Sequence, residues 1–424
     1  MEKKILSLIL MVSLFCLCAE CLAQEQEMKF PTPEFSINYQ IPSAQHPAPR
    51  SDWFEYMDVL ILLAALAMAS YLALKKRSRQ GLFLMTVFSV VYFGFYKKGC
   101  VCSVGSIQNV VWSFASESYV LPITVLCFFM LPIIFSLFYG RVFCSSVCPL
   151  GAIQELFIYK PKKIPQTLKH LLSIIPYLYL GLVVLFTATK TGFFICKYDP
   201  FIGFYRLSGN YIMFLTGSFF LLLGIFIARP YCRFFCPYGI ILGFFSFFSK
   251  KYLKIHPTDC IQCKLCEDSC PVEAIEHPSP LRYKTKIKDQ VKKMVYYILL
   301  IPVLMAVMGF SVSRLADFLA QENRIVRLSE ELSKGSQGLL KINSLEGAAF
   351  IESARSIESL NQEAKLIKNK FYLGTWLLGC FLGFVFSLKL IILMVRYRRE
   401  DYEPNRFHCL SCGRCMEYCP VKEN

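Results

Sequence analysis

Cysteines are the residues in this chain most able to carry chemistry, and eight of its 20 cysteines follow one spacing. Two segments repeat the pattern C-x-x-C-x-x-C-x-x-x-C-P. Soft thiolates at this spacing are typical ligands of [4Fe–4S] clusters in bacterial ferredoxins. Zinc also binds C-x-x-C pairs, but two complete copies with the trailing proline favour iron–sulfur clusters. The two runs are Cys260, Cys263, Cys266 and Cys270, and Cys409, Cys412, Cys415 and Cys419.

In ferredoxins with two clusters, the fourth cysteine of each run ligates the cluster of the other run. We therefore expect the two halves, residues 254–292 and 396–424, to fold together as one small split ferredoxin domain. The expected ligand sets are Cys260, Cys263, Cys266 and Cys419 for one cluster, and Cys409, Cys412, Cys415 and Cys270 for the other.

A second repeated motif, C-x-x-x-C-P-x-G, occurs at residues 144–151 and again at 232–239, with an offset of 88 residues. Residues i and i+4 share one face of a helix, so each copy is expected to present two thiols together. The proline is expected to end or kink that helix. A packing role for small apolar cysteines is the alternative, but the matched repeat favours a redox or metal role. The inner-face centre, with iron–sulfur or copper as its metal, would use Cys144, Cys148, Cys232 and Cys236.

Each copy of this motif follows a predicted helical hairpin whose outer loop also carries cysteine. These outer residues are Cys100 and Cys102 in the first copy and Cys196 in the second. They could hold a cluster or a copper ion, or two of them could form a disulfide in an oxidising compartment. Cys127 and Cys380 have no partners within their apolar runs and are interpreted as packing residues. No C-x-x-C-H motif is present, so covalent haem is not expected.

The elements that must position these cysteines are mainly membrane helices. Hydrophobic residues make up 55% of the chain and the mean hydropathy is +0.45, which excludes disorder and disfavours an ordinary soluble enzyme. A spanning helix needs about 20 apolar residues. Residues 234–249 are also uncharged, but Pro237 interrupts them, so they suit an interfacial helix. Seven runs suit spanning helices: 59–74, 80–96, 118–140, 170–189, 207–228, 294–313 and 371–388.

The basic residues favour one orientation of these helices. Residues 1–23 resemble a secretory signal peptide, with an uncleaved anchor helix as the alternative. Starting outside after residue 23, 26 of the 46 Lys and Arg fall in cytoplasmic segments and only seven in the short outer ones. Cytoplasmic loops are enriched in Lys and Arg, so both ferredoxin halves are predicted to be cytoplasmic. The net charge of +16 then marks membrane topology and not a nucleic-acid partner.

The expected fold is therefore a polytopic α-helical membrane protein with about seven spans, a duplicated hairpin core and a small split ferredoxin domain of the bacterial two-[4Fe–4S] type. Residues 314–370 contain apolar residues at helical spacing around Gly335–Gly338 and predict an extracytoplasmic helical hairpin. The predicted segments are a signal peptide (1–23), an extracytoplasmic Pro-rich arm (24–53), the transmembrane core (54–253), the first ferredoxin half (254–292), a transmembrane helix (293–313), the hairpin (314–370), a second transmembrane helix (371–395) and the second ferredoxin half (396–424).

Together these motifs resemble membrane iron–sulfur proteins of the NapH/NosR type. The resemblance rests on residues 143–150 and 232–239, the following ferredoxin runs, and the outer segment from Asp199 to Arg206. It covers about residues 95–290. It implies a bacterial inner-membrane redox component, as opposed to a stand-alone enzyme, that passes electrons between quinol or cytoplasmic donors and an extracytoplasmic reductase system. No Ser/Thr-Gly-Ala-Thr motif is present, so no covalent flavin is expected.

The expected electron path connects the ferredoxin clusters, the inner-face thiols and the outer cysteines, in either direction. Because a bilayer core is about 30 Å thick, a centre between the two sides is needed for rapid transfer. Two other functions use the same residues. A related accessory group reduces copper for the assembly of a respiratory enzyme, and a redox-sensing regulator could signal through the outer hairpin. Metal content and partner identity distinguish the three.

Overall fold

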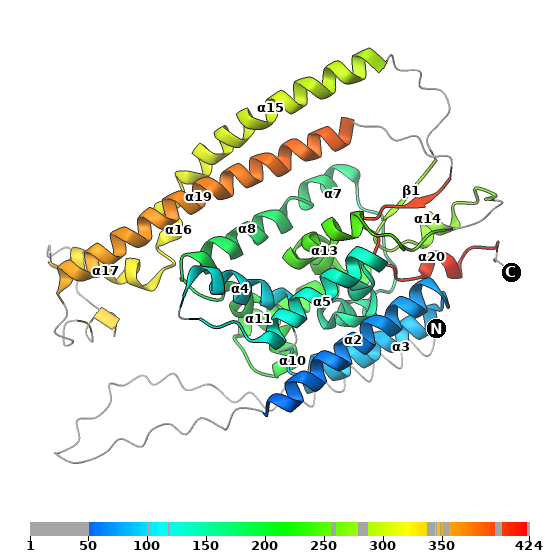
Figure 1. Cartoon of the computed structure of the whole chain (residues 1–424), viewed down its shortest axis with the longest axis horizontal. Helices are drawn as coiled ribbons and strands as arrows, with labels where there is room; N and C mark the ends of the chain where they lie inside the picture. Colours follow the sequence, from blue (N-terminus) through cyan, green and yellow to red (C-terminus); the bar gives the residue numbers. More distant parts are fainter. Residues whose placement is uncertain are drawn as a thin grey trace.

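The computed structural model describes residues 51–421 apart from 100–101, 118, 256–259, 279–286, 337–343, 345, 348–349, 351–355 and 395–400. The predicted signal peptide, most of the Pro-rich arm and Cys100 therefore lie outside the described residues. The described chain is mostly helical, with two short strands near the carboxyl terminus (Figure 1).

The core helices come first along the chain. They form one apolar cluster that joins the first long helix to both copies of the C-x-x-x-C-P motif. The elements are α2 (Asp52–Leu74), α3 (Arg79–Ser89), the π-helix η1 (Val90–Tyr96), α4 (Ser103–Ala115), α5 (Ile123–Tyr139), the π-helix η2 (Phe143–Val147), α6 (Pro149–Leu156), α7 (Gln166–Leu172), α8 (Ile175–Ala188), α9 (Phe194–Tyr198), α10 (Ile202–Arg206), α11 (Tyr211–Phe226), α12 (Pro230–Phe234) and α13 (Pro237–Phe247).

The carboxyl-terminal part holds the two longest described helices and both strands. Its elements are α14 (Leu265–Ser269), β1 (Ile275–Glu276), α15 (Ile287–Ser313), α16 (Ala316–Ala320), α17 (Arg324–Ser336), α19 (Ile357–Met394), β2 (Glu403–Pro404) and α20 (Arg414–Glu417).

Helix length supports four of the seven predicted spans. All seven apolar runs are largely helical, but within the described residues only four helical segments are long and apolar enough to cross a membrane. The helices α5, α11 and α13 are apolar but shorter, with 17, 16 and 11 residues. The run 80–96 is divided between α3 and η1. The four long segments are Trp53–Leu74, Gln166–Ala188, Val295–Ser313 and Ile357–Leu393.

Helices α15 and α19 lie side by side along their length (Figure 1). Glycines explain the close approach, because a Cβ built at Gly379 would lie 2.3 Å from the carbonyl oxygen of Met308. A Cβ at Gly383 would lie 2.6 Å from the carbonyl oxygen of Leu304. Gly379 and Gly383 form the small-x-x-x-small pattern that lets membrane helices pack backbone to backbone. The contact therefore requires glycine at both positions.

The predicted outer hairpin is partly described. Its first arm contains α16 and α17, and its second arm is the beginning of α19, which runs without a break into the apolar segment. Leu332, Phe350 and Leu360 form a small apolar cluster between the arms. Ser329 donates a hydrogen bond to Asn361 at 2.7 Å. The predicted transmembrane segment 371–395 lies in the same continuous helix as this arm, because α19 runs from Ile357 to Met394.

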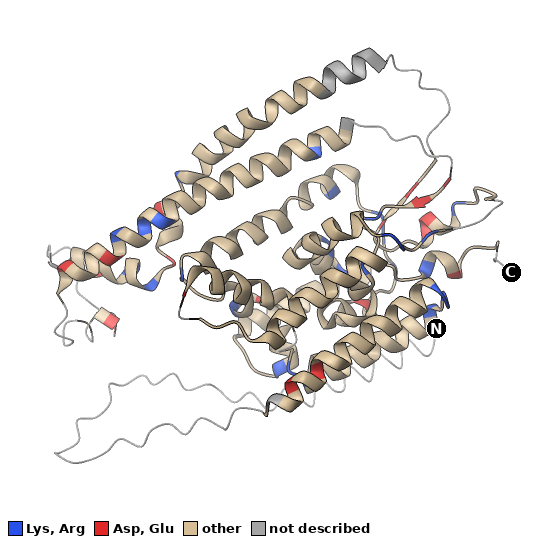
Figure 2. Cartoon of the chain, in the orientation of Figure 1, with Lys and Arg blue, Asp and Glu red and all other residues tan. Residues whose placement is uncertain are grey.

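The two ferredoxin halves meet at one end of the helical core. Strand β1 pairs antiparallel with β2, with Ile275 opposite Pro404 and Glu276 opposite Glu403. Helices α14 and α20 also contact each other. Figure 2 shows charged residues gathered at helix ends, while the middle parts of the long helices carry almost none. Segments about 130 residues apart in the sequence thus form one unit beside the core.

Candidate functional site

The two C-x-x-x-C-P motifs adopt a local structure that differs from the predicted helical face. Cys144 lies in η2, whereas Cys148 has an extended backbone and forms the N-cap of α6. In the second copy Cys232 lies in α12, and Cys236 is the extended N-cap of α13. The expectation that each pair shares one helical face is therefore wrong. The proline opens the following helix, because its fixed φ suits the first helical position.

This arrangement explains why each motif has a glycine two residues after its proline. In each copy the glycine amide donates a hydrogen bond to the cysteine sulfur at the N-cap, Gly151 to Cys148 and Gly239 to Cys236. A Cβ at Gly151 would lie 3.2 Å from the carbonyl oxygen of Cys144, and one at Gly239 would lie 3.1 Å from Nη2 of Arg141. Glycine thus keeps the N-terminal turn close to the sulfur and to the neighbouring copy.

The four inner-face thiols converge in the core of the protein. Cys148 interacts electrostatically with the other three, and Cys144 interacts with Cys232. Cys148 and Cys236 are buried, and burial raises the pKa of Cys232 to about 12. Nε2 of Gln154 lies 3.2 Å from Sγ of Cys232. Buried thiols with nearby N–H donors are suited to bind a soft metal as thiolates, because the metal and the donors compensate the buried charge.

An arginine three residues before the first cysteine of each copy reaches across to the other copy. Arg229, from the second copy, donates to the carbonyl oxygens of Cys144 and Ser145, the latter at 2.6 Å. Arg141, from the first copy, packs against Gly239 and lies 3.8 Å from Sγ of Cys144. This exchange ties the two motifs into one site. The repeated arginine was the signal in the sequence that could have revealed these two residues.

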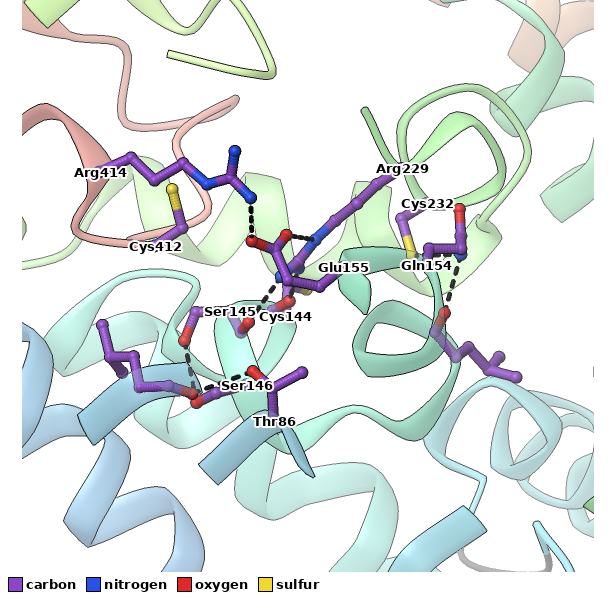
Figure 3. Close-up of polar contacts among 12 residues, drawn as sticks. Thr86, Cys144, Ser145, Ser146, Gln154, Glu155, Arg229, Cys232, Cys412 and Arg414 are labelled. Atoms are coloured by element: carbon purple, nitrogen blue, oxygen red, sulfur yellow. Dashed lines mark hydrogen bonds and ion pairs between the residues drawn. The ribbon is translucent and has the colours of Figure 1, made fainter. Parts of the chain in front are cut away.

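A buried carboxylate joins the inner-face thiols to the second ferredoxin half (Figure 3). Glu155 accepts from Arg229 at 2.9 Å and from Arg414 at 2.7 Å, and it also pairs with Arg79. Its side chain is only 1% exposed. Burial alone would raise the pKa of Glu155, but the three guanidinium groups lower it to about 2. Glu155 is therefore a fixed negative charge, although no cysteine motif in the sequence points to it.

The arginines around Glu155 connect the thiols of the two sites. Arg229 interacts electrostatically with both Cys232 and Cys412. Arg414 lies between Cys412 and Cys415 in the sequence, and Arg79 donates to the carbonyl oxygen of Cys412 at 3.2 Å. Positive charge between two thiolate sites lowers the cost of burying either of them. The ferredoxin half is held against the core by charge as well as by packing.

The structure brings most of the ferredoxin cysteines near one another. Cys266 interacts with Cys260 and Cys263, while Cys270 interacts with Cys412 of the other run. Cys415 interacts with Cys409, Cys412 and Cys270, and also with Cys266, which the crossed scheme assigns to the other cluster. The structure gives no such interaction for Cys419, which is half-buried.

Both cysteine runs have the same backbone conformation at equivalent positions. Gln262 and Ser411 have φ values of 50° and 53°, and Lys264 and Gly413 have 63° and 74°. Such left-handed residues turn successive backbone N–H groups inwards, as in anion-binding loops. The amide of Ala274 lies 3.3 Å from Sγ of Cys270. The two loops thus share one backbone conformation, and their thiols lie beside backbone N–H donors.

Packing brings the second ferredoxin run directly against the inner-face site. Cys144, Cys270 and Cys409 all contact one apolar cluster that includes Leu410 and Val272. Nη1 of Arg141 donates to the carbonyl oxygen of Phe407 at 2.9 Å. Ser246 in α13 donates to the carbonyl oxygen of Arg406 at 2.8 Å. Thiols of the two sites therefore share neighbours.

The outer cysteines are only partly described. Cys102 is the N-cap of α4, and its sulfur accepts from the amide of Gly105 at 3.4 Å. A Cβ at Gly105 would lie 3.6 Å from Sγ of Cys196, so the sulfurs of Cys102 and Cys196 flank one glycine. Cys196 is exposed and Cys102 is half-buried. Cys100 lies outside the described residues.

A buried tyrosine links the outer and inner thiols. The hydroxyl of Tyr205 donates to the carbonyl oxygen of Pro149 at 2.7 Å, directly after Cys148. Its ring also packs against Gly99, next to the outer cysteines, and Tyr205 interacts electrostatically with Cys102 and Cys148. The two thiol groups are therefore neighbours of one side chain.

Asp199 lies beside the same tyrosine and is fully buried. Its Oδ1 accepts from the amides of Phe201 and Ile202, at 2.8 and 3.2 Å. Burial raises its pKa to about 6. The Asp-Pro-Phe segment, on which the family resemblance partly rests, thus caps its own following turn.

The neighbouring thiols do not form a closed set of metal ligands in this structure. Among the described residues, the inner-face and ferredoxin cysteines included, no group of three or more His, Cys, Asp or Glu side chains is preassembled to hold a metal ion. Cys380 is buried in α19 against Gly309 of α15, which fits the predicted packing role. Cys127 is half-buried in α5.

Comparison with family models supports iron–sulfur binding at both motifs. A model described as a 4Fe-4S binding domain matches residues 121–166 and again 210–255. Each match contains one C-x-x-x-C-P motif, in agreement with the duplication. A second 4Fe-4S binding domain model matches residues 253–276, which contain the first ferredoxin run. No solved structure matches the chain.

Several curated proteins are similar to parts of the chain. An uncharacterized protein of Methanocaldococcus jannaschii is 31% identical over 193 residues, which are 43% of this chain and 78% of that protein. The regulatory protein NosR of Stutzerimonas stutzeri is 29% identical over 53% of this chain and 34% of NosR. YccM of Escherichia coli, named for electron transport, is 27% identical over 33% of this chain and 43% of YccM. The chain thus spans less than half of the two relatives whose names indicate a role.

Proposed function

Since the chain belongs to the NapH/NosR-type family of membrane iron–sulfur proteins, we propose that it carries electrons between a cytoplasmic split ferredoxin domain and redox partners outside the membrane. The observation that carries this proposal is the contact between the second ferredoxin run and the inner-face thiols. Cys144, Cys270 and Cys409 pack on one apolar cluster, and Glu155 holds Arg414 of the ferredoxin half to Arg229 of the core.

The residues that would hold two [4Fe–4S] clusters are the eight ferredoxin cysteines in their crossed sets. Such clusters supply one-electron redox chemistry. The chain contributes the thiolates, backbone N–H donors such as that of Ala274, and buried positive charge from Arg229 and Arg414. Hydrogen bonds and nearby charge are the means by which a protein sets the potential of such a site.

The inner-face thiols Cys144, Cys148, Cys232 and Cys236 form a further centre in this proposal. The match of a 4Fe-4S binding domain model to both motifs favours iron–sulfur over copper there. This centre lies between the ferredoxin half on one side and Tyr205, with the outer thiols Cys102 and Cys196, on the other. The geometry supports transfer from one side of the core to the other, in a direction that the redox partners determine.

The proposed location is a bacterial inner membrane, crossed several times, with the ferredoxin domain in the cytoplasm and the 314–370 hairpin outside. The excess of basic residues in the predicted cytoplasmic segments supports this orientation. The proposed partners are membrane lipid, an extracytoplasmic reductase system, and either the quinone pool or a cytoplasmic donor. The likeness to NosR and YccM supports a redox partner without identifying it.

A copper-handling assembly factor is the second candidate, because Cys102 and Cys196 flank one glycine at the outer end of the core. Paired thiols are soft ligands that select Cu(I). In that case the same clusters would reduce copper, and the metal would be found at this pair.

Metal analysis of the purified chain tests the proposal. After anaerobic purification we expect about eight irons for two [4Fe–4S] clusters and about four more for a third. Cys144→Ala and Cys232→Ala should each remove the additional four, while Cys127→Ala, a half-buried cysteine in α5, should leave the iron unchanged. Fewer than about eight irons in the wild type would overturn the proposal.

Electron transfer itself needs a second measurement. The reduced wild-type protein should be reoxidised by a water-soluble quinone analogue, and Cys144→Ala should slow this reoxidation at least tenfold. Copper that co-purifies with the wild type and is lost in Cys196→Ala, without quinone-linked reoxidation, would instead assign the assembly function.

A further inference from the structure

A basic cavity of about 290 Å³, whose lining contains no cysteine, lies beside the second ferredoxin half. One wall comes from the end of α2 and the residues after it, Leu74 and Arg77. The opposite wall is residues 250–254, which follow α13, and Met416 of α20 closes the side towards the ferredoxin half. Three segments far apart in the sequence thus meet around one space.

The lining carries four cationic side chains and no carboxylate. The cations are Arg77, Lys250, Lys251 and Lys254, and the three lysines are exposed. A fifth cation, Arg406, stacks on the ring of Tyr252 with its guanidinium carbon 4.1 Å from the ring centre. Because like charges repel, several cations around one space favour an anionic occupant.

The cavity lies where helix ends meet apolar exposed surface. Leu74 is the last residue of a helix long and apolar enough to cross a membrane. Phe244, Phe247 and Phe248, which precede Lys250, are 56–59% exposed. The amide of Lys251 also donates to the carbonyl oxygen of Phe138 at the end of α5, at 2.9 Å. Exposed aromatic residues followed by lysines are typical of the boundary between acyl chains and headgroups.

We propose that this cavity binds the phosphate headgroup of an anionic phospholipid, with the acyl chains lying along the phenylalanines of α13. A soluble phosphate would satisfy the cations but not the adjacent exposed Phe244, Phe247 and Phe248. The acidic surface of a cytoplasmic protein would likewise leave these three exposed phenylalanine rings without an apolar partner. The observations therefore favour the lipid over both other anions.

The bound lipid would stabilise the ferredoxin half on the membrane side. Leu253, which lines the cavity, is buried in the apolar cluster that contains Cys266 and Cys415. Met416 packs against the same cluster. A headgroup held by Lys250, Lys251 and Lys254 therefore touches the two segments that support these cysteines.

Lipid retention by the intact protein tests this inference without any measurement of electron transfer. The full chain, purified anaerobically in a neutral detergent, is incubated with phosphatidylglycerol or phosphatidylcholine, and bound lipid is counted by native mass spectrometry. We expect retention of phosphatidylglycerol but not of phosphatidylcholine. Lys250→Gln/Lys251→Gln/Lys254→Gln should weaken retention by about fivefold per lysine, equivalent to about 1 kcal/mol each.

A matched control distinguishes the cavity from general attraction between basic residues and lipid. Lys160 and Lys162 are exposed lysines that do not line the cavity. Their amides donate to the carbonyl oxygens of Ile225 and Phe226 at the end of α11. Lys160→Gln/Lys162→Gln should change retention by less than twofold. Equal retention by wild type and triple variant would overturn the inference. Displacement of the lipid by millimolar inorganic phosphate, or competition by an acidic redox protein, would also overturn it.

Discussion

Replacing Glu155 by glutamine should weaken the connection between the core and the second ferredoxin half. Glu155 is 1% exposed and pairs with Arg79, Arg229 and Arg414. Glutamine has nearly the same shape but no charge, so the buried guanidinium of Arg229 and the partly buried ones of Arg79 and Arg414 lose the carboxylate that they share. Breaking a buried ion pair from one side costs about 3–5 kcal/mol.

The pKa of Glu155 gives a similar magnitude. The pKa is about 2 in the folded protein against an ordinary 4.5. A difference of about 2.5 units corresponds to about 3 kcal/mol of stabilisation at neutral pH. The cost of breaking the ion pair and the free energy from the pKa difference agree. Glu155→Gln should therefore lower the free energy of unfolding by several kcal/mol, which is a large part of the stability of a typical domain.

Thermal unfolding and metal content of the anaerobically purified variant measure this effect. We expect a lower unfolding midpoint and the loss of about four irons, because Arg414 lies within the second ferredoxin run. Glu417→Gln is the matched control, since Glu417 is an exposed carboxylate in the same run. A midpoint and iron content equal to the wild type would refute the reasoning, as would an equal loss in the control.

Three further outcomes follow from the same structure. Gly239→Ala places a Cβ 3.1 Å from Arg141 and should lower the iron at the inner-face centre, measured per chain, whereas Gly224→Ala, whose Cβ would meet no atom closer than 3.8 Å, should leave it unchanged. Gly379→Leu should separate α15 from α19, and protease should then cleave the 314–370 hairpin faster in detergent. Equal cleavage of variant and wild type would contradict this. Because the folded pKa of Glu155 is depressed, its stabilisation is present above about pH 4.5 and is lost as the pH falls towards 2. Melting curves at pH 6 and pH 3.5 should therefore differ more in wild type than in Glu155→Gln, and parallel curves would contradict the assignment.

Much of the candidate site could be predicted from local spacing. The two ferredoxin runs and the two C-x-x-x-C-P motifs are short-range patterns, because a cluster or metal takes several ligands from one loop. The apolar runs predicted helices where helices lie, since helix formation in apolar segments depends on local composition. The structure also pairs β1 of the first ferredoxin half with β2 of the second.

Other features could not be predicted because they depend on contacts between distant segments. The C-x-x-x-C spacing fits a helical face, yet the proline opens a new helix and makes Cys148 and Cys236 N-caps. The role of Glu155 depends on arginines up to 259 residues away in the sequence. A lone buried glutamate has no spacing pattern that reveals such partners.

The sequence by itself predicted the cysteine motifs, the apolar helices and the duplication, because each depends on residues close together along the chain. Only the tertiary structure decided that the two motif copies exchange arginines, that Glu155 ties the ferredoxin half to the core, and that Tyr205 links the inner and outer thiols. The physical reason is burial. A charge or thiol removed from water must be compensated by neighbours, and folding alone selects which distant residues become those neighbours.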